Sequence, residues 1–406
     1  MDVLDLLEAR GFIKESTGIE SLRKTMNEGR ITYYVGFDPT ADSLHVGHML
    51  PVMAMAWLQR AGHRPIVVLG GGTAMVGDPS GKTEMRTLIS QEQILENAEG
   101  MKQQLSHFLE FGDDSGEMVN NADWLLNLNY ISFLRDVGRH FSVNRMLAAE
   151  AYKLRLERGL SFIEFNYQLL QAYDFLELHR QYGCTLQMGG DDQWGNILAG
   201  TDLIRRVVQG DAHGLTFPLI TTAAGAKMGK TAKGAVWLDP KRMSVFDFYQ
   251  YWLNVDDRDV IRLMKLYTFL PLEEIAPLER LEGAEIRKAK RVLAHEVTTL
   301  VHGVDAAKQA AEAAQAMVSG QANAELPTFD VDGEALTAGV KIYAVLADAK
   351  VCSSRSDARR QIKGGAVKIG TDRITDLETT LPADLDEEGV VVRVGKKRAV
   401  RVRRNS

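Results

Sequence analysis

The first 220 residues of this 406-residue chain alternate apolar runs with amphipathic stretches. Runs at 31–35, 66–70 and 186–189 have the length and side chains of buried strands, and helical periodicity separates them. This alternation is typical of a mainly parallel sheet in an α/β domain. Such sheets bind ligands at the carboxyl ends of their strands. The sequence therefore predicts a Rossmann-like domain over 1–220 with its site at that edge.

Two histidines mark the junction between the first of these strands and the helix predicted over 49–60. His45 and His48 flank Gly47 there. The free N–H groups and positive dipole of a helix N-terminus suit phosphate, and glycine lets a nucleotide lie against the backbone. Histidine can donate hydrogen bonds to phosphate oxygens as charge builds. Ordinary polar residues or a metal site are alternatives, but no third ligand follows at a telling spacing.

A second segment, which contains lysines, makes the interpretation of the histidine pair more specific. Lys227, Lys230 and Thr231 lie in a glycine-containing loop predicted after a strand at 215–220. A mobile loop with two lysines can close on a triphosphate and neutralise a leaving pyrophosphate. Taken alone, this segment is better explained as a solvated basic loop. The combination with the histidine pair favours nucleotide chemistry.

A polar stripe interrupts the long apolar helix predicted over 162–179. Tyr167, Gln171 and Asp174 recur at spacings of four and three and share one helical face. Buried polar groups need partners, so the stripe indicates either a ligand or an internal network. Other polar residues cluster where loops leave strands, namely Tyr34, Asp78, Gln187, Asp191, Asp192 and Gln193. This set suits a zwitterionic amino acid and a ribose.

Two common nucleotide motifs are absent from the glycine-rich segments. The segment 77–83 resembles a phosphate loop, but Val76 stands where a Walker A motif needs glycine. The dinucleotide pattern GxGxxG does not fit 70–75 either.

The histidine and lysine segments together resemble the HIGH and KMSKS signatures of class I aminoacyl-tRNA synthetases, with Gly229 in place of the usual serine. Longer motifs resemble the bacterial tyrosyl-tRNA synthetases over the whole chain. They begin at Tyr34, Gly77, Phe141, Gln171 and Gly189 and read YxGFDPTADSLH, GDPSGK, FSVN, QAYDF and GGxDQWGN. The resemblance implies a tyrosine–tRNA ligase that forms tyrosyl-adenylate and pyrophosphate from L-tyrosine and ATP. It then implies transfer of the tyrosyl group to the 3′ end of tRNA(Tyr).

The resemblance also implies roles for individual residues. Tyrosine would be bound by Tyr34, Asp78, Tyr167, Gln171, Asp174 and Gln193. ATP would lie against Gly36, Asp38, Gly47, His48, Gly190, Asp192 and Lys230. Catalysis would rest on Thr40, His45, His48, Lys82, Arg86, Lys227, Lys230 and Thr231. Mg²⁺ would accompany ATP as part of the substrate, without a metal site in the protein.

The carboxyl-terminal segment differs in charge from the rest of the chain. Residues 339–406 hold 15 Lys and Arg against 9 Asp and Glu, or +6, so the total of −6 leaves −12 on the first 338 residues. A basic module on an acidic body indicates a polyanionic partner. The helix predicted after Ser353 places Arg355, Arg359 and Lys363 near one face. With the strands at 366–369, 389–394 and 399–402, this segment resembles a small RNA-binding module shared by a ribosomal protein and pseudouridine synthases.

The organisation predicted for the whole chain has four parts. A catalytic domain over 1–220 is followed by the lysine loop and an α-helical domain over 221–318, a linker over 319–336 and a small α+β RNA-binding domain over 337–406. RNA contacts are expected from Arg355, Arg359, Arg360, Lys363, Lys396 and Lys397. Cys184 and Cys352 are too far apart in sequence to imply a disulfide framework. The chain shows no signal peptide or membrane-spanning run, so we expect a cytoplasmic protein.

Several alternatives remain at this point. The segment 130–145 is either an interface helix or plain core, although the resemblance favours a homodimer bridged by tRNA. A tryptophanyl-tRNA synthetase would share both signatures but would not need the Tyr34–Asp174 pair. A cytidylyltransferase would share the histidine pattern but would not explain the basic segment at the end. A non-enzymatic RNA-binding paralogue would have lost residues that this chain retains.

Overall fold

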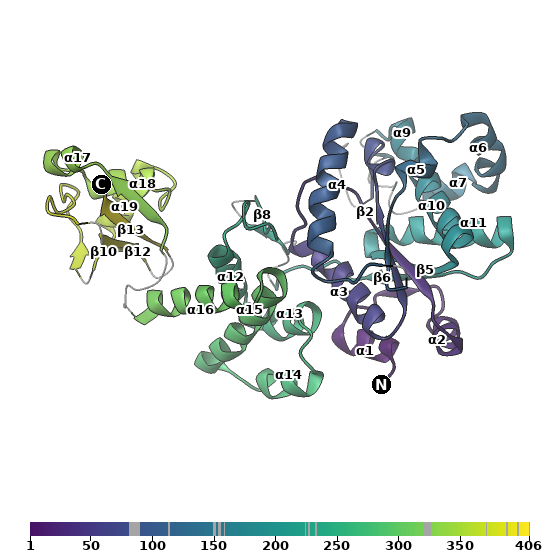
Figure 1. Ribbon diagram of the computed structural model, residues 1–406, viewed down its shortest axis with the longest axis horizontal. Helices are drawn as coiled ribbons and strands as arrows, with labels where there is room; N and C mark the ends of the chain where they lie inside the picture. Colours follow the sequence, from purple (N-terminus) through teal and green to yellow (C-terminus); the bar gives the residue numbers. More distant parts are fainter. Residues whose placement is uncertain are drawn as a thin grey trace. The chain divides into compact units, whose positions relative to one another are not determined.

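The computed structural model describes residues 1–80, 90–112, 114–148, 152, 156–157, 159–223, 225, 228–231, 234–319, 326–370, 372–386, 389–395 and 398–405. The chain divides into two compact units, Met1–Val301 and His302–Ser406. Each unit contains its own sheet (Figure 1). In the described part of the chain, no helix is long and apolar enough to cross a membrane.

The sheet of the first unit has six strands in the order β1-β6-β5-β2-β3-β4. Their bounds are β1 Glu15–Ser16, β2 Thr32–Phe37, β3 Arg64–Leu69, β4 Glu117–Asn120, β5 Cys184–Gly190 and β6 His213–Phe217. Strands β2 to β6 are parallel to their neighbours, and only β1 runs antiparallel. This order confirms the Rossmann-like sheet predicted from the sequence. It reverses between β2 and β5, which is where open parallel sheets bind their ligands.

Helices cover both faces of this sheet. Tyr34 of β2 and Val68 of β3 pack with Phe175 of helix α10 (Tyr167–Tyr182) and its neighbour α11 (Trp194–Val208). Tyr33, one residue earlier, faces the other side and donates a 2.5 Å hydrogen bond to the Met55 carbonyl in α3 (Val46–Arg60). Because successive strand residues point to opposite faces, this single strand is buried on both sides.

Two helices differ from the predicted boundaries because of their caps. Helix α3 begins at Val46, not at 49, since the Nδ1 atom of His45 accepts a 3.0 Å hydrogen bond from the Gly47 N–H. The helix predicted over 162–179 is split into α9 (Phe162–Phe165) and α10, with Asn166 between them. A capping box between Ser161 and Glu164 starts α9.

The other helices of the first unit lie before and after the sheet strands. Those before β6 are α1 Val3–Arg10, α2 Ile19–Glu28, α4 Gln91–Leu105, α5 Ala122–Leu125, α6 Tyr130–Asp136 and α7 Val143–Ala148. After β6 come the hairpin β7 Lys230–Thr231 and β8 Gly234–Ala235, then α12 Val245–Leu253, α13 Val260–Tyr267, α14 Leu272–Glu279 and α15 Ile286–His302. Pro277 lies inside α14, which ends at Glu279, and a short turn at Gly283–Glu285 precedes α15.

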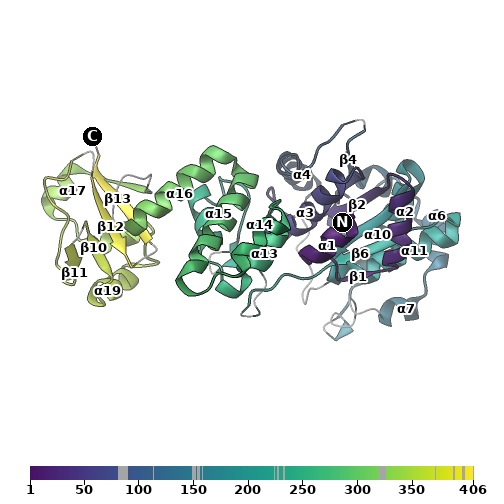
Figure 2. The ribbon, with the colours of Figure 1, turned by 90° about the horizontal axis from the view of Figure 1, so that it is seen from below.

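The second unit begins with α16 (Val304–Ser319) and holds a five-stranded sheet in the order β11-β10-β12-β13-β9. The strands are β9 Thr328–Val331, β10 Val367–Ile369, β11 Asp372–Ile374, β12 Val390–Val394 and β13 Arg398–Arg404. Helices α17 Gly333–Ala338, α18 Ile342–Asp348 and α19 Arg355–Lys363 complete this unit (Figures 1 and 2). Strand β9 pairs in parallel with β13, so part of the range 319–336 belongs to this sheet.

Candidate active site

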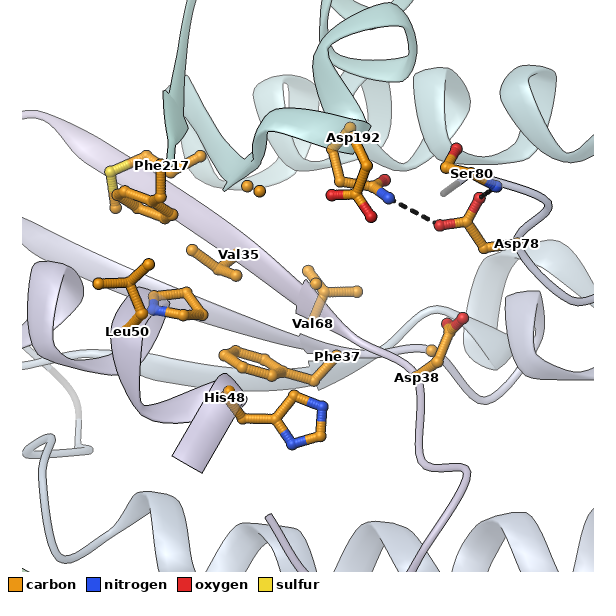
Figure 3. Close-up of a pocket in the computed structure, with 18 of the residues that line it drawn as sticks. Val35, Phe37, Asp38, His48, Leu50, Val68, Asp78, Ser80, Asp192 and Phe217 are labelled. Carbon is orange, nitrogen blue, oxygen red and sulfur yellow. Dashed lines mark hydrogen bonds between the residues drawn. The ribbon is translucent and has the colours of Figure 1, made fainter. Parts of the chain in front are cut away.

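A cavity of about 460 Å³ opens at the carboxyl ends of β2 and β5. It lies at the reversal point of the sheet, where the sequence predicted a site. Figure 3 shows Leu50, Val35 and Phe217 toward one end of this pocket and the carboxylates of Asp78 and Asp192 toward the other. The residues predicted for tyrosine and nucleotide that line it are Tyr34, Gly36, Asp38, Thr40, His45, Gly47, His48, Asp78, Tyr167, Gln171, Asp174, Gly190, Asp192 and Gln193.

The Asp174 carboxylate is buried and held by two donors. Asn121 Nδ2 donates to Oδ2 at 2.9 Å, and Trp124 Nε1 donates to Oδ1 at 2.7 Å. Burial raises the pKa of Asp174 to about 7, while these two hydrogen bonds act in the opposite direction by favouring the ionised form. The carboxylate is therefore fixed in position and titrates near neutral pH.

Tyr34 lies beside this carboxylate with its polar atom unsatisfied. Its hydroxyl is buried and makes no hydrogen bond within the part of the chain that the structure describes. Burial, and then the charge of Asp174, hold the pKa of Tyr34 well above its ordinary value, so the group is a neutral phenol. A buried hydroxyl without a partner is costly, and a polar atom of a ligand can remove that cost.

Amides and a carboxylate form a second polar cluster in the pocket. Gln193 Nε2 donates to Asp78 Oδ2 at 2.7 Å, and Asn196 Nδ2 donates to the amide oxygens of Gln171 and Gln193, both at 3.1 Å. The Ser80 N–H donates to Asp78 Oδ1 at 2.9 Å (Figure 3). Asp78 and Gln171 both line the pocket, and their oxygen acceptors suit an ammonium group.

Asp38 connects two parts of the site. Its Oδ2 accepts a hydrogen bond from the Tyr167 hydroxyl at 3.4 Å, and its Oδ1 accepts one from Thr73 Oγ1 at 3.0 Å. Thr73 in turn accepts from Asn121 Nδ2 at 3.0 Å. The network joins the end of β2 to the residues around Asp174.

The two histidines stack on each other at the start of α3. Their ring centroids are 3.8 Å apart and the planes differ by 12°. The backbone next to them pairs with the segment after the lysine loop, since Val46 N donates to Val236 O and Leu238 N donates to Leu44 O, both at 2.9 Å. Val236 N also donates to Gly229 O at 2.8 Å. The two signature segments, far apart in sequence, are thus joined through residues 236–238.

The predicted cationic residues are only partly visible. Lys82, Arg86 and Lys227 lie outside the described residues, and the structure describes only the backbone of Lys230 and Thr231, which form β7. Their contribution to the site stays a prediction. In the described residues, no group of three or more His, Cys, Asp or Glu is arranged to hold a metal ion.

The predicted RNA-binding residues of the second unit are exposed on α19. Arg355, Arg359, Arg360 and Lys363 point away from the core, into which Ala358 and Ile362 are buried. The Arg359 guanidinium lies 4.2 Å from the centre of the Tyr343 ring, and Arg360 pairs with Asp357 at 2.7 Å. Lys396 and Lys397 lie outside the described residues.

Sequence reasoning missed the residues that hold the predicted ones in place. Asn121 and Trp124 follow β4, a short strand that was not predicted, and Asn196 and Ser80 were given no role. Had β4 been recognised, Asn121 would have been found by the same rule that selected the other polar residues at strand ends. Trp124 carries no signal of this kind, because its role depends on the fold bringing α5 to α10.

Comparisons with known proteins agree with this geometry. A family model described as class I tRNA synthetases (W and Y) matches residues 26–319, and one described as a tyrosine–tRNA ligase SYY-like C-terminal domain matches 319–402. The tyrosine–tRNA ligase of Clostridium tetani is 52% identical over 398 residues, which is 98% of this chain and 97% of that protein. The corresponding ligase of Clostridium botulinum strain Eklund 17B is 54% identical, with 98% of each chain covered.

Solved structures show the same relationship. A C-terminally truncated mitochondrial tyrosyl-tRNA synthetase of Aspergillus nidulans aligns with a TM-score of 0.69 and 32% identity, covering 77% of this chain and 92% of that one. The tyrosyl-tRNA synthetase of Archaeoglobus fulgidus shares the fold, with a TM-score of 0.56 at 19% identity. By its sequence over nearly its full length and by its fold, this chain belongs to the class I tRNA synthetases and, among them, to the bacterial tyrosyl-tRNA synthetases.

Proposed function

We propose that the pocket of this aminoacyl-tRNA synthetase activates L-tyrosine with ATP, giving tyrosyl-adenylate and pyrophosphate, and that the enzyme then esterifies the 3′ end of tRNA(Tyr). The observation that carries this proposal is the buried pair formed by the neutral Tyr34 hydroxyl and the fixed Asp174 carboxylate. A phenolic hydroxyl can donate to Asp174 and accept from Tyr34 at the same time. A phenylalanine ring would leave both groups buried and unsatisfied.

The rest of the pocket suits the remainder of the amino acid. The oxygens of Asp78 and Gln171 would accept hydrogen bonds from the ammonium group, together with the Tyr167 hydroxyl. Gln193 would orient the carboxylate side. Asp192, Gly190 and the backbone at Gly36 would bind the ribose of ATP, as the position of these residues at the ends of β2 and β5 supports.

The chemical step needs no nucleophile or base from the protein. The tyrosine carboxylate is already ionised and attacks the α-phosphorus of ATP, so pyrophosphate leaves. The enzyme lowers the barrier by positioning the reactants and by stabilising the charge that develops on phosphorus and pyrophosphate. Thr40 and His45 would bind the γ-phosphate, while Lys82, Arg86, Lys227 and Lys230 would surround the pyrophosphate. Mg²⁺ would enter with ATP as part of the substrate.

We assign tRNA binding to the second unit and expect the enzyme to work in the cytoplasm. The exposed basic face of α19 would contact phosphates, adding affinity more than sequence discrimination. The double substitution Arg359→Ala with Lys363→Ala should therefore raise the KM for tRNA(Tyr) severalfold and leave tyrosine activation unchanged. Equal KM values for both proteins would remove α19 from the interface.

The same unit of the chain that holds the pocket carries an apolar surface suited to a second copy. Helices α6, α7 and α9 contribute side chains to one hydrophobic cluster, and residues of α7 and α11 line one small hollow (Figure 1). Large apolar side chains are exposed on them, with Ile131 and Phe162 each 70% exposed and Tyr130, Val143, Ile163 and Leu198 between 39% and 56%. Large exposed apolar side chains gathered on neighbouring helices are typical of an interface. We propose that it forms a homodimer across which tRNA binds.

The overall activity has a direct test. The purified full-length enzyme should attach labelled tyrosine to tRNA(Tyr) in a reaction that requires ATP and Mg²⁺. Failure to charge tRNA(Tyr), from folded enzyme that binds tyrosine, would contradict the proposed transfer step.

A further inference from the structure

The lysine loop, defined here as residues 221–231, has described residues at both of its ends. Met228 N donates to Ile220 O at 2.9 Å and brings these ends together. Both ends also make hydrogen bonds to the helices that follow the loop.

The first end of the loop is held by a buried carboxylate. Asp259 is 5% exposed, and its Oδ2 accepts a 2.7 Å hydrogen bond from the Ala223 N–H. Its Oδ1 pairs with Arg262 Nη2 at 2.7 Å, and the same Nη2 donates to the Thr221 carbonyl. Two side chains at the start of α13, those of Asp259 and Arg262, thus bind the backbone of the loop at Ala223 and Thr221.

Asp259 occupies a position at which an aspartate usually caps its own helix. Asp259 is the N-cap residue of α13, where an aspartate ordinarily accepts a hydrogen bond from its own helix. Here the side chain makes no such bond, and its oxygens are used by Ala223 and Arg262 instead. Helix α13 therefore lacks a side-chain cap, and the same carboxylate binds the loop instead.

The other end of the loop is tied to α12 and lies against the histidine segment. The Gly229 N–H donates to the Tyr251 hydroxyl at 3.3 Å. A Cβ atom added to Gly229 would lie 3.3 Å from the Gly47 backbone nitrogen, so the loop backbone approaches the start of α3 closely.

Helix α13, which begins after Asp259, is itself held against α3 through Arg10. Arg10 is 2% exposed and donates to the carbonyls of Lys265, Thr268 and Leu270 at the carboxyl end of α13. Its guanidinium lies 4.2 Å from the centre of the Trp57 ring in α3. One end of α13 is therefore held to the helix that begins with the histidine pair, and the other end holds the loop.

We propose that Asp259 is a positioning residue for tyrosine activation. It sets the lysine loop at the distance from His45 and His48 that the leaving pyrophosphate requires. The inference rests on the proposed function of that loop. Asp259 does not line the pocket, so it acts through the loop and not on the substrates.

The test compares Asp259→Ala and Asp259→Asn with Asp256→Asn as the matched control. Asp256 belongs to the same segment but binds Arg258, and no hydrogen bond joins its side chain to the described residues of the loop. Misplacing reacting groups by about 1 Å can cost about 100-fold in rate. We expect Asp259→Ala to lower kcat for ATP–pyrophosphate exchange by about 10- to 100-fold, with the Kd for tyrosine changed less than about twofold. Asp259→Asn, which keeps an oxygen for Ala223, should fall between Asp259→Ala and the unsubstituted enzyme.

A second readout follows the loop itself. Trypsin cleavage after Lys227 and Lys230, identified by mass spectrometry, should be faster in Asp259→Ala than in the control. Unchanged kcat and unchanged cleavage in Asp259→Ala would overturn the proposal, as would equal losses of kcat and tyrosine affinity. If the unsubstituted enzyme showed no exchange, the proposed function would fall, and the cleavage rates would still decide whether Asp259 holds the loop.

Discussion

The indole Nε1 of Trp124 donates a 2.7 Å hydrogen bond to the carboxylate of Asp174, the residue that we assign to the substrate hydroxyl. We predict that Trp124→Phe weakens tyrosine binding by about tenfold, because a hydrogen bond to a charged group contributes about 1.5–3 kcal/mol. Calorimetric titration with tyrosine measures this change. Phenylalanine, which does not use Asp174, should lose much less affinity, and equal losses for both amino acids would assign Trp124 to general packing.

Tyrosine binding should depend on pH near neutrality. Burial raises the pKa of Asp174 from its usual value of 3.8 to about 7. The ionised carboxylate is the form that accepts the phenolic proton, so affinity should rise as the pH increases through about 7 and level off above it. In Trp124→Phe one donor to the ionised form is lost, so the midpoint should move to higher pH. If the affinity for tyrosine did not change between pH 5.5 and 8, Asp174 would not be the group that recognises the hydroxyl.

His45 should act on the rate and not on amino-acid binding. We expect His45→Ala to lower kcat of activation by about 100-fold, the typical cost of removing one donor to transition-state charge, with the KM for tyrosine nearly unchanged. His45 also caps α3 through Gly47. His45→Asn keeps a capping side chain without the imidazole, so it should be as slow as His45→Ala. Recovery of the rate in His45→Asn would show that the cap is what matters.

Gly229 should not tolerate a side chain. Its φ of 80° lies in the left-handed region, which costs other residues about 1–2 kcal/mol, and its approach to Gly47 leaves little room. Gly229→Ala should therefore lower kcat of activation at least tenfold. Gly225→Ala is the control, because Gly225 has a φ of 81° but no atom of the described residues lies within 4 Å of an added Cβ. Similar rates for the two variants would show that the close approach of Gly229 to Gly47 does not affect activation.

The proposed dimer makes a prediction about assembly. Ile131→Glu places a charge on the exposed apolar surface and should convert the dimer to a monomer in analytical ultracentrifugation. Leu95→Glu is the control, since Leu95 is 53% exposed on α4, outside that surface. A dimer that persists in Ile131→Glu would exclude this surface as the interface.

The parts that could be predicted from sequence are those with a local signal. Alternating apolar runs predicted the parallel strands, and the spacing of Tyr167, Gln171 and Asp174 predicted one polar stripe on a helix, which the structure places in the lining of the pocket. Strand β4 was not predicted because Glu117–Asn120 is short and has polar residues at both ends. Asn121 and Trp124, which follow it, were missed for the same reason. The contacts of Asp259 and Arg10 join residues 36 and more than 250 positions apart, respectively. Only the folded chain brings such residues together.

The central claim is that a pocket built around Tyr34 and Asp174 activates tyrosine because of its hydroxyl group. ATP–pyrophosphate exchange, measured with each amino acid in turn and without tRNA, tests that claim most directly. The account predicts rapid exchange with tyrosine, almost none with phenylalanine, and loss of the tyrosine signal in Asp174→Ala. Exchange with phenylalanine at a comparable rate, or tyrosine exchange that survives in Asp174→Ala, would contradict it.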